Sequence, residues 1–197
     1  MHQICRFLES LFLIDKYQKR GDTVSNFNEC MKIILRWEGG YVNHPEDPGG
    51  MTNMGITKRV YESWLGRKVD ENTMRNINKD HVEQIYRERY WDKLMADELP
   101  AGIDLVVFDF GVNAGISRSA RYLQGMVGAG QDGLIGPKTL QALNEYTSRN
   151  SARQVIEAFS EIRRDYYRSL HHFNTFGRGW LNRTDDVEKN ALEMIRV

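Results

Sequence analysis

The amino-acid sequence predicts a mainly α-helical fold with a small β-hairpin or ordered loop. Three observations support this prediction. The 197 residues contain only four prolines, the glycines gather in short segments, and the segments between them carry apolar residues at helical spacing. A composition of 41% hydrophobic and 27% charged residues is typical of a globular protein with a sizeable core and argues against a disordered chain.

The first helix is expected to begin at Asn26, because Asn26 and Glu29 have the spacing of a capping box. One face of this helix carries residues at intervals of four, three and four: Phe27, Met31, Ile34 and Glu38. This face is apolar until its last member, which is a carboxylate. Gly39 and Gly40 then end the helix.

Residues 41–57 begin with turn-forming residues and continue as a short extended segment that returns along the chain. A small hairpin or an ordered loop is therefore expected there. Thr57 can cap a helix that runs through Trp64 and closes at Gly66.

Further helices are expected along the rest of the chain. Asp80 and Glu83 form a second capping box, and 101–115 is apolar almost all round, which favours a central buried helix over a buried strand. The expected ranges are 80–95, 101–115, 117–126, a helix after the turn at 131–139, 151–172, and a last helix from 185.

The balance of charge argues against nucleic acid as a partner. The 27 Lys and Arg residues are matched by 27 Asp and Glu residues, so the excess positive charge that phosphate binding uses is missing. The glycine-rich segment 125–136 lacks the lysine pattern of a phosphate-binding loop, and we therefore expect no nucleotide either.

Cysteine and histidine usage indicates no metal and no cofactor. Cys5 and Cys30 have no metal-ligand spacing, and no His/Cys cluster accompanies them. Two free thiols without a redox or metal-binding role are the favoured interpretation, and a single Cys5–Cys30 disulfide is the alternative.

The first 25 residues are interpreted as an N-terminal extension. Their apolar stretch is interrupted by Arg6 and Glu9, and it lacks both a basic start and a small-residue cleavage site. A signal peptide would have these features.

Glu38 is the first candidate for chemistry. A carboxyl group between an apolar helix face and a glycine turn is partly desolvated, which disfavours its charged form. A neutral carboxylic acid is what protonation of a leaving oxygen requires. The alternative interpretation is a Glu that only caps the turn.

Asp47 and Thr52 lie on the returning segment, nine and fourteen positions after Glu38. An acid at a helix end facing a carboxylate on a loop is the layout of a glycoside hydrolase. Taken singly, Asp47 before Pro48 is ordinary turn chemistry, and Thr52 is an ordinary strand hydroxyl.

The buried helix expected at 101–115 adds two polar residues. Asp109 and Asn113 share a face, and a buried charge at Asp109 must be paired, which makes this residue at least structural. Asn113 has two interpretations, a core position or a contact to a sugar amide or water. Tyr90 likewise belongs either to an aromatic core stripe or to the site, where its hydroxyl would bond a carboxylate.

Four motifs occur in order between about Phe27 and Gly115: Glu38-Gly39-Gly40-Tyr41, Asp47-Pro48-Gly49-Gly50-x-Thr52-x-x-Gly55-Ile56-Thr57, Tyr86-x-x-x-Tyr90-Trp91 and Phe108-Asp109-x-x-Val112-Asn113-x-Gly115. Together they resemble glycoside hydrolase family 108, the N-acetylmuramidases of phage endolysins and of toxin secretion in Gram-negative bacteria. Two further motifs are similar to the peptidoglycan-binding region that follows in that family: Leu123-Gln124 and Asp132-Gly133-x-x-Gly136-Pro137-x-Thr139.

The resemblance implies a lysozyme-like helical fold with a muramidase catalytic region 26–115 and a helical peptidoglycan-binding region 116–197 packed on it. The extension 1–25 has no counterpart in the family. The resemblance also implies that Glu38 is the catalytic glutamate, and the order Glu38, Asp47, Thr52 resembles the triad of phage-type lysozymes. Four residues separate Asp47 from Thr52, one fewer than in that pattern.

The implied reaction is hydrolysis of the β-1,4 bond between N-acetylmuramic acid and N-acetylglucosamine, for cell-wall lysis or wall passage in protein secretion. Tyr41, Tyr90 and Asn113 are the expected substrate contacts, with Asp109 structural near the site. The alternatives are a lytic transglycosylase, which could dispense with Asp47, and a non-catalytic peptidoglycan-binding module.

The expected partner is the peptidoglycan glycan strand, bound by a monomer. Without a recognisable signal peptide, the protein is expected to be made in the bacterial cytoplasm. It would act on the wall in the periplasm and use a holin-like export partner.

Overall fold

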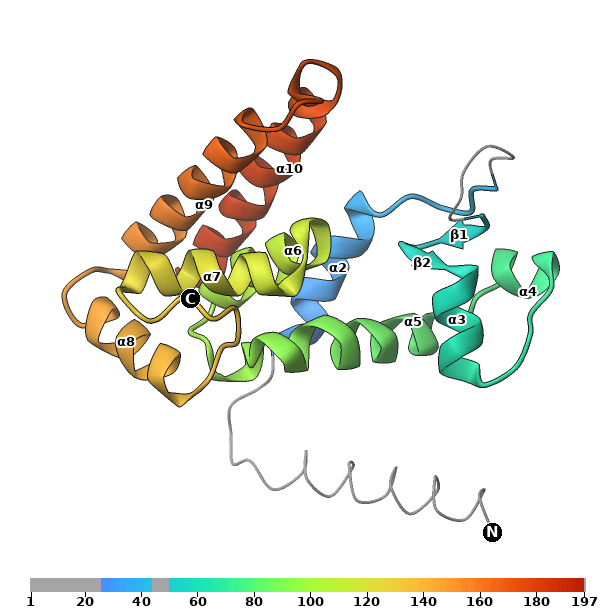
Figure 1. Ribbon diagram of the computed structural model, residues 1–197, viewed down its shortest axis with the longest axis horizontal. Coiled ribbons are helices and arrows are strands. Elements are labelled where there is room, and N and C mark those ends of the chain that lie inside the picture. The colour runs from blue at the N-terminus through green and yellow to red at the C-terminus, as the bar shows by residue number, and fades with distance from the viewer. Residues whose placement is uncertain (1–25, 44–49, 197) are drawn as a thin grey trace, which may run out of the picture.

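The computed structural model describes residues 26–43 and 50–196 (Figure 1). Within these ranges, nine α-helices accompany one two-stranded antiparallel sheet, which confirms the predicted fold class. The helices are α2 (Phe27–Trp37), α3 (Lys58–Leu65), α4 (Glu71–Arg75), α5 (Lys79–Tyr86), α6 (Ile103–Ala114), α7 (Ile116–Val127), α8 (Pro137–Thr147), α9 (Ala152–Arg168) and α10 (Phe173–Met194). The strands are β1 (Thr52–Asn53) and β2 (Ile56–Thr57). In Figure 1 the hairpin, α3 and α4 lie at one end of the body, α8 lies at the other, and α9 and α10 run side by side away from it.

Helix α2 follows Asn26 as expected, but the predicted capping box with Glu29 is wrong, because the Asn26 side chain does not cap the helix. Its Nδ2 instead donates to Asp104 Oδ2 on α6 at 2.9 Å. Asp104 is buried and needs a partner, so this long-range bond takes precedence over the local cap. The apolar face of α2 is buried as predicted.

The expected hairpin forms with Thr52 opposite Thr57. Its two turn residues, Met54 and Gly55, have φ angles of 49° and 73°. Two consecutive residues with positive φ make the tight turn whose twist matches that of the strands. The turn therefore has a fixed shape beside the end of α2.

Helix α3 has the predicted ends. Thr57 accepts a hydrogen bond from Val60 N, and Gly66 closes the helix with a φ of 69°. Thr57 thus ends β2 and caps α3, which joins the hairpin directly to the helical body.

The long helix predicted over 80–95 is divided. Asn78, not Asp80, caps α5, because the Asn78 side chain accepts from Asp80 N at 2.7 Å. A π-helical turn (Arg87–Trp91) and two 3₁₀ turns (Asp92–Leu94 and Ala96–Glu98) continue the chain. Trp91 is fully buried at the π turn, and its Nε1 donates to Asp97 at 2.8 Å.

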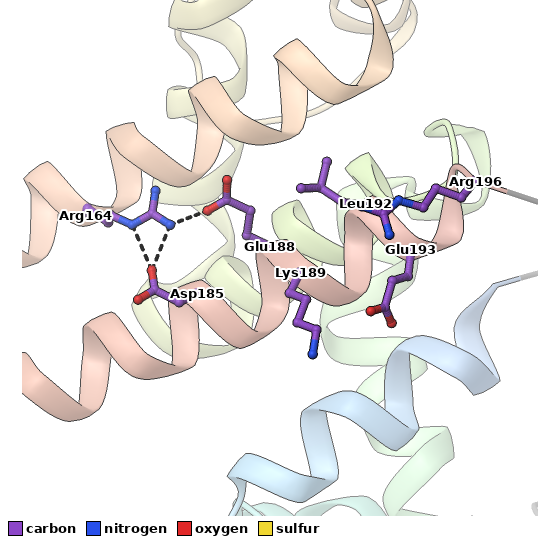
Figure 2. Close-up of a pocket in the computed structure, with 7 residues that line it drawn as sticks. All are labelled: Arg164, Asp185, Glu188, Lys189, Leu192, Glu193 and Arg196. Atoms are coloured by element: carbon purple, nitrogen blue, oxygen red, sulfur yellow. Dashed lines mark hydrogen bonds and ion pairs between the residues drawn. The ribbon is translucent and has the colours of Figure 1, made fainter.

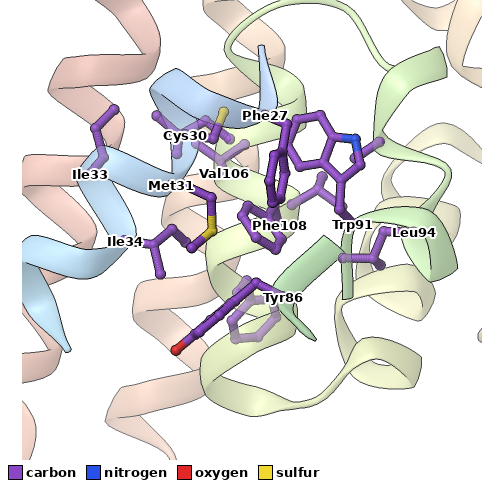
Figure 3. Packing of buried hydrophobic residues seen from close by; sticks show 14 of the residues in the cluster. Phe27, Cys30, Met31, Ile33, Ile34, Tyr86, Trp91, Leu94, Val106 and Phe108 are labelled. Carbon is purple, nitrogen blue, oxygen red and sulfur yellow. The ribbon is translucent and has the colours of Figure 1, made fainter. Parts of the chain in front are cut away.

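Helix α6 is the centre of the core, as its apolar pattern predicts. Every residue from Ile103 to Gly111 is buried. The Trp91 ring packs edge-on against Phe27 and Phe108, with centroid distances of 5.3 and 5.1 Å. These rings join α2, the π turn and α6 (Figure 3).

Helices α9 and α10 pair with each other and pack on α6. The prediction that the last helix begins near 185 is wrong, because α10 begins at Phe173 and includes Gly177 and Gly179. A Cβ at Gly177 would lie 2.5 Å from the Phe173 ring, so the missing side chain makes room for that ring. This close packing outweighs the low helix propensity of glycine.

None of the helices in the described ranges combines the length and the apolar character needed to cross a membrane.

Candidate active site

Glu38 lies where α2 ends. Its backbone is extended (φ −79°, ψ 130°), and its N–H still bonds Ile34 O at 3.1 Å, so the chain turns away from the helix at this residue. The side chain is 18% exposed. The carboxyl group is therefore held largely within the protein and still reaches solvent.

Arg183 on α10 holds one oxygen of this carboxyl group. Its Nη1 donates to Glu38 Oε1 at 3.0 Å. The same guanidinium donates from Nε and Nη2 to Asp109 Oδ1 on α6, at 3.0 and 2.7 Å. One cation thus ties together three helices that are far apart in sequence, and it fixes the orientation of Glu38.

Asp109 lies between two arginines. It is fully buried, and Arg163 Nη2 on α9 approaches its Oδ2 to 2.5 Å, as an ion pair outside hydrogen-bonding geometry. Burial opposes the charged form of Asp109, but the guanidinium groups of Arg163 and Arg183 outweigh it, so the pKa of Asp109 is lowered. Burial also works against the charge of Arg183, but Asp109 and then Glu38 outweigh it and raise the pKa of Arg183. The site therefore has a permanent cation next to Glu38.

The hairpin turn lies against the second oxygen of Glu38. Met54 N donates to Gly39 O at 3.1 Å, and Tyr86 Oη donates to Met54 O at 3.1 Å. A Cβ at Gly55 would lie 2.2 Å from Tyr86 Oη and 2.8 Å from Glu38 Oε2. Only a residue without a side chain allows this approach, which explains the glycine in the third position of the turn.

Tyr86 of α5 and Tyr90 of the π turn lie close enough to Glu38 for its charge to raise their pKa values. Burial and then Glu38 raise the pKa of Tyr86. The pKa of Tyr90 is also raised, mainly by burial, with Arg89 opposing and Glu38 adding to the shift. The rings of Tyr86 and Tyr90 lie 5.6 Å apart. Tyr86 is buried, whereas Tyr90 is partly exposed and can meet a ligand.

Thr52 lies on β1 and is tied to the segment after Glu38. It exchanges two backbone hydrogen bonds with Val42, both of 2.8 Å. The next residue, Asn53, is buried and donates to two carbonyl groups near the end of α4. Successive strand side chains point to opposite faces, so Thr52 faces away from this buried side and is partly exposed. Asp47, its predicted partner, lies outside the described residues.

Tyr41 packs against α4. The Arg75 guanidinium lies over its ring, 4.1 Å from the centroid. Burial and then the Glu71 carboxylate raise the pKa of Tyr41. The Tyr41 hydroxyl is buried without a hydrogen-bond partner among the described residues, so the ring is the part of Tyr41 that remains for a sugar contact.

Asn113 lies at the exposed end of α6, one turn after Asp109. Its Nδ2 donates to Asp109 O at 2.8 Å. The side chain is therefore oriented by its own helix.

The arginines at residues 163 and 183 are site residues that sequence reasoning missed. They lie 54 and 74 positions after Asp109, with no local pattern that connects them. The available signal was Asp109 itself, because a buried carboxylate requires a partner. The sequence could indicate that a cation was needed, but not which of the 27 would supply it.

Within the described ranges, no group of three or more His, Cys, Asp and Glu residues is arranged to hold a metal ion. Cys30 is a buried free thiol on α2, and Cys5, its proposed partner, lies outside these ranges.

Comparison with known proteins identifies the family. The family model described as Glycosyl hydrolase 108 matches residues 31–115, and that described as Predicted Peptidoglycan domain matches residues 118–185. Among solved structures, Brucella abortus SagA is similar with a TM-score of 0.76 and 40% sequence identity, over 89% of this chain and 98% of that chain. This likeness confirms the mainly α, lysozyme-like fold. The comparison with curated proteins gave no significant match. The chain therefore belongs to glycoside hydrolase family 108, a family of N-acetylmuramidases, and is a glycoside hydrolase that acts on cell-wall peptidoglycan.

Proposed function

We propose that the protein hydrolyses the β-1,4 bond between N-acetylmuramic acid and N-acetylglucosamine, with Glu38 as the general acid. The observation that carries this proposal is the placement of the Glu38 carboxyl group. Arg183 binds Oε1, and the turn at Gly55 lies against Oε2, so the group is oriented from two sides while 18% of the side chain stays exposed. An acid must be held in this way to protonate a glycosidic oxygen in a fixed geometry.

The second catalytic group in this proposal is Asp47, which activates water or stabilises the oxocarbenium-like state. Thr52 orients the water from the exposed side of β1. Tyr41, Tyr90 and Asn113 contact the sugars, Tyr41 through its ring. These roles follow from the resemblance, and the partly exposed positions of Thr52 and Tyr90 are compatible with them.

We assign catalysis to the region 26–115 and peptidoglycan binding to 116–197. The ion pair between Arg183 and Glu38 crosses this boundary. The second region therefore contributes to the geometry of the acid as well as to binding. We also propose that the protein acts as a monomer in the periplasm. Its activity there would serve either cell-wall lysis or passage through the wall during protein secretion.

The test compares dye release from labelled peptidoglycan sacculi by the wild type, Glu38→Gln and Glu29→Gln. Loss of a general acid lowers the rate by roughly two to four powers of ten. Glu29 lies on the same helix with 64% of its side chain exposed, so Glu29→Gln controls for the charge change and is expected to keep full activity. A Glu38→Gln protein that releases dye at the wild-type rate would disprove the assignment.

A further inference from the structure

A groove lies where α6 passes into α7. It has a volume of about 700 Å³, and it lies between this junction, the 3₁₀ turn at Lys93 and the loop before α8. Three cations line it, Lys93, Arg118 and Arg121, and its lining contains no Asp or Glu. A groove lined by one sign of charge attracts ligands of the opposite sign.

These cations are available to a ligand. In the part of the chain that the structure describes, Lys93 and Arg121 form no ion pair. The nearby Asp132 accepts hydrogen bonds from Gln124 and from Leu134 N, and its pKa is lowered by these bonds and, to a smaller extent, by the charge of Arg121. Arg118 uses Nη1 to bond Ala114 O at 2.6 Å, and its guanidinium lies 4.7 Å from the centroid of the Tyr166 ring. Arg118 is therefore held in place while other N–H groups of its guanidinium are left for a ligand.

A second pocket, between α9 and α10, shows the contrasting case (Figure 2). Its Arg164 binds both Asp185 and Glu188. The positive charge there is already neutralised within the protein. The groove at the α6–α7 junction has no such internal partners among its lining residues.

The wall of the groove is fixed by Gln124. This buried side chain donates to Asp132 Oδ1 at 2.7 Å and to Leu134 O at 3.0 Å, and accepts from Gly133 N at 2.9 Å. Gly133 has a φ of 81°, and a Cβ there would lie 2.3 Å from Ser117 Oγ. The loop thus packs directly on the first turn of α7, so the groove is formed before a ligand arrives.

The groove lies at the C-terminal end of α6, the helix that carries Asp109. Its lining begins at Ala114, which is five residues, or about 7.5 Å along the helix axis, beyond Asp109. Asp109 is joined to Glu38 through Arg183. The groove and the Glu38 carboxyl group are thus connected through α6 and Arg183.

We propose that the groove binds the carboxylate-bearing stem peptide of the substrate; this rests on the proposed muramidase function. In a peptide-substituted strand the lactyl carboxyl of each muramic acid is consumed in an amide, so the sugars carry no charge for three cations to recognise. The stem peptide supplies several free carboxylates. Charge-assisted hydrogen bonds from Lys93, Arg118 and Arg121 would hold it and make the enzyme prefer strands that carry peptides.

The test is a double variant, Lys93→Gln with Arg121→Gln, on two substrates: sacculi fragments with stem peptides, and the same glycan strands after an amidase has removed the peptides. The amidase frees one lactyl carboxylate on each muramic acid, so the second substrate keeps a charge on the sugar and lacks only the carboxylates of the peptide. The ratio of kcat/KM for peptide-bearing to peptide-free strands should fall about tenfold, through KM, because hydrogen bonds to charged groups are lost. Lys79→Gln with Arg149→Gln removes the same charges from exposed positions outside the groove and should leave the ratio unchanged.

Calorimetric titration with a free stem tetrapeptide gives a readout that needs no catalysis. The wild type should bind the tetrapeptide, and the groove variant should bind it at least about tenfold more weakly. An unchanged ratio, an equal loss on both strands, or tetrapeptide affinity that the variant retains would overturn the proposal. Absence of hydrolysis with normal tetrapeptide binding would instead reject the muramidase function and leave the peptide site standing.

Discussion

Asp109 supports the strongest stability prediction, because it is the only anion between two largely buried cations in the described part of the site. Asp109 is 0% exposed, and the side chains of Arg163 and Arg183 are 2% and 10% exposed. Asp109→Asn keeps the shape of the side chain and removes its charge. Both guanidinium groups then remain in the protein with their central counter-charge gone.

The expected cost follows from this burial. Breaking a buried ion pair by removing one partner costs about 3 to 5 kcal/mol, because an uncompensated charge is left in the interior. For a chain of this size each kcal/mol lowers Tm by about 2 to 4 °C. Asp109→Asn should therefore lower Tm by roughly 6 to 20 °C.

Thermal unfolding at neutral pH, followed by circular dichroism, measures the change. Asp165→Asn is the matched control: Asp165 also binds an arginine, Arg168, but it is 71% exposed. Exposed pairs contribute at most about 1 kcal/mol, so this variant should stay within a few degrees of the wild type. A Tm for Asp109→Asn as close to the wild type as that of the control would refute the view that Asp109 holds the two arginines in the site.

Two further predictions concern the hairpin and α6. Gly55→Ala should lower activity at least about tenfold, because its Cβ would displace Tyr86 Oη or Glu38 Oε2. Gly128→Ala is the control: Gly128 has a similar φ of 76° and no atom within 4 Å, so the variant carries the same backbone strain of about 1 to 2 kcal/mol and should stay active. Equal activities of the two variants in a dye-release assay would contradict the steric argument. Burial raises the pKa of Asp104 from 3.8 to about 6, so the folded state keeps this proton to a higher pH than the unfolded chain. The resulting stabilisation is complete below about pH 4 and is lost as pH rises through about 6, with an upper limit of about 3 kcal/mol. Urea titrations from pH 4 to 7 should therefore show the wild type losing stability relative to Asp104→Asn, and a difference that does not change with pH would contradict this.

Local features of the fold could be predicted from the sequence. Thr57 and Gly66 bound α3 because each satisfies backbone groups within a few residues. The continuous burial of α6 follows from apolar residues on all its sides. The two failures have different causes. Asn26 makes a long-range bond to Asp104, 78 positions away, instead of capping its own helix. Gly177 is helical although glycine has a low helix propensity, and the Phe173 ring, one turn earlier in the same helix, packs on it.

In the candidate site, too, residues defined by local sequence could be predicted, and residues placed by long-range packing could not. Glu38 could be found because its helix face and its glycine turn are contiguous in sequence. Arg183 could not, because it lies 145 positions after Glu38 and only the packing of α10 on α6 and α2 brings them together. The roles of Asp47 and Thr52 remain predictions.

Mass spectrometry of muropeptides released from purified sacculi distinguishes the proposed cleavage from its alternatives. The wild type should release fragments that end in reducing N-acetylmuramic acid, and Glu38→Gln should release none. Anhydro-muramic ends would show a transglycosylase that does not need Asp47. Reducing N-acetylglucosamine ends would move the cleavage to the other glycosidic bond, and release of the same fragments by Glu38→Gln would contradict the role given to this residue.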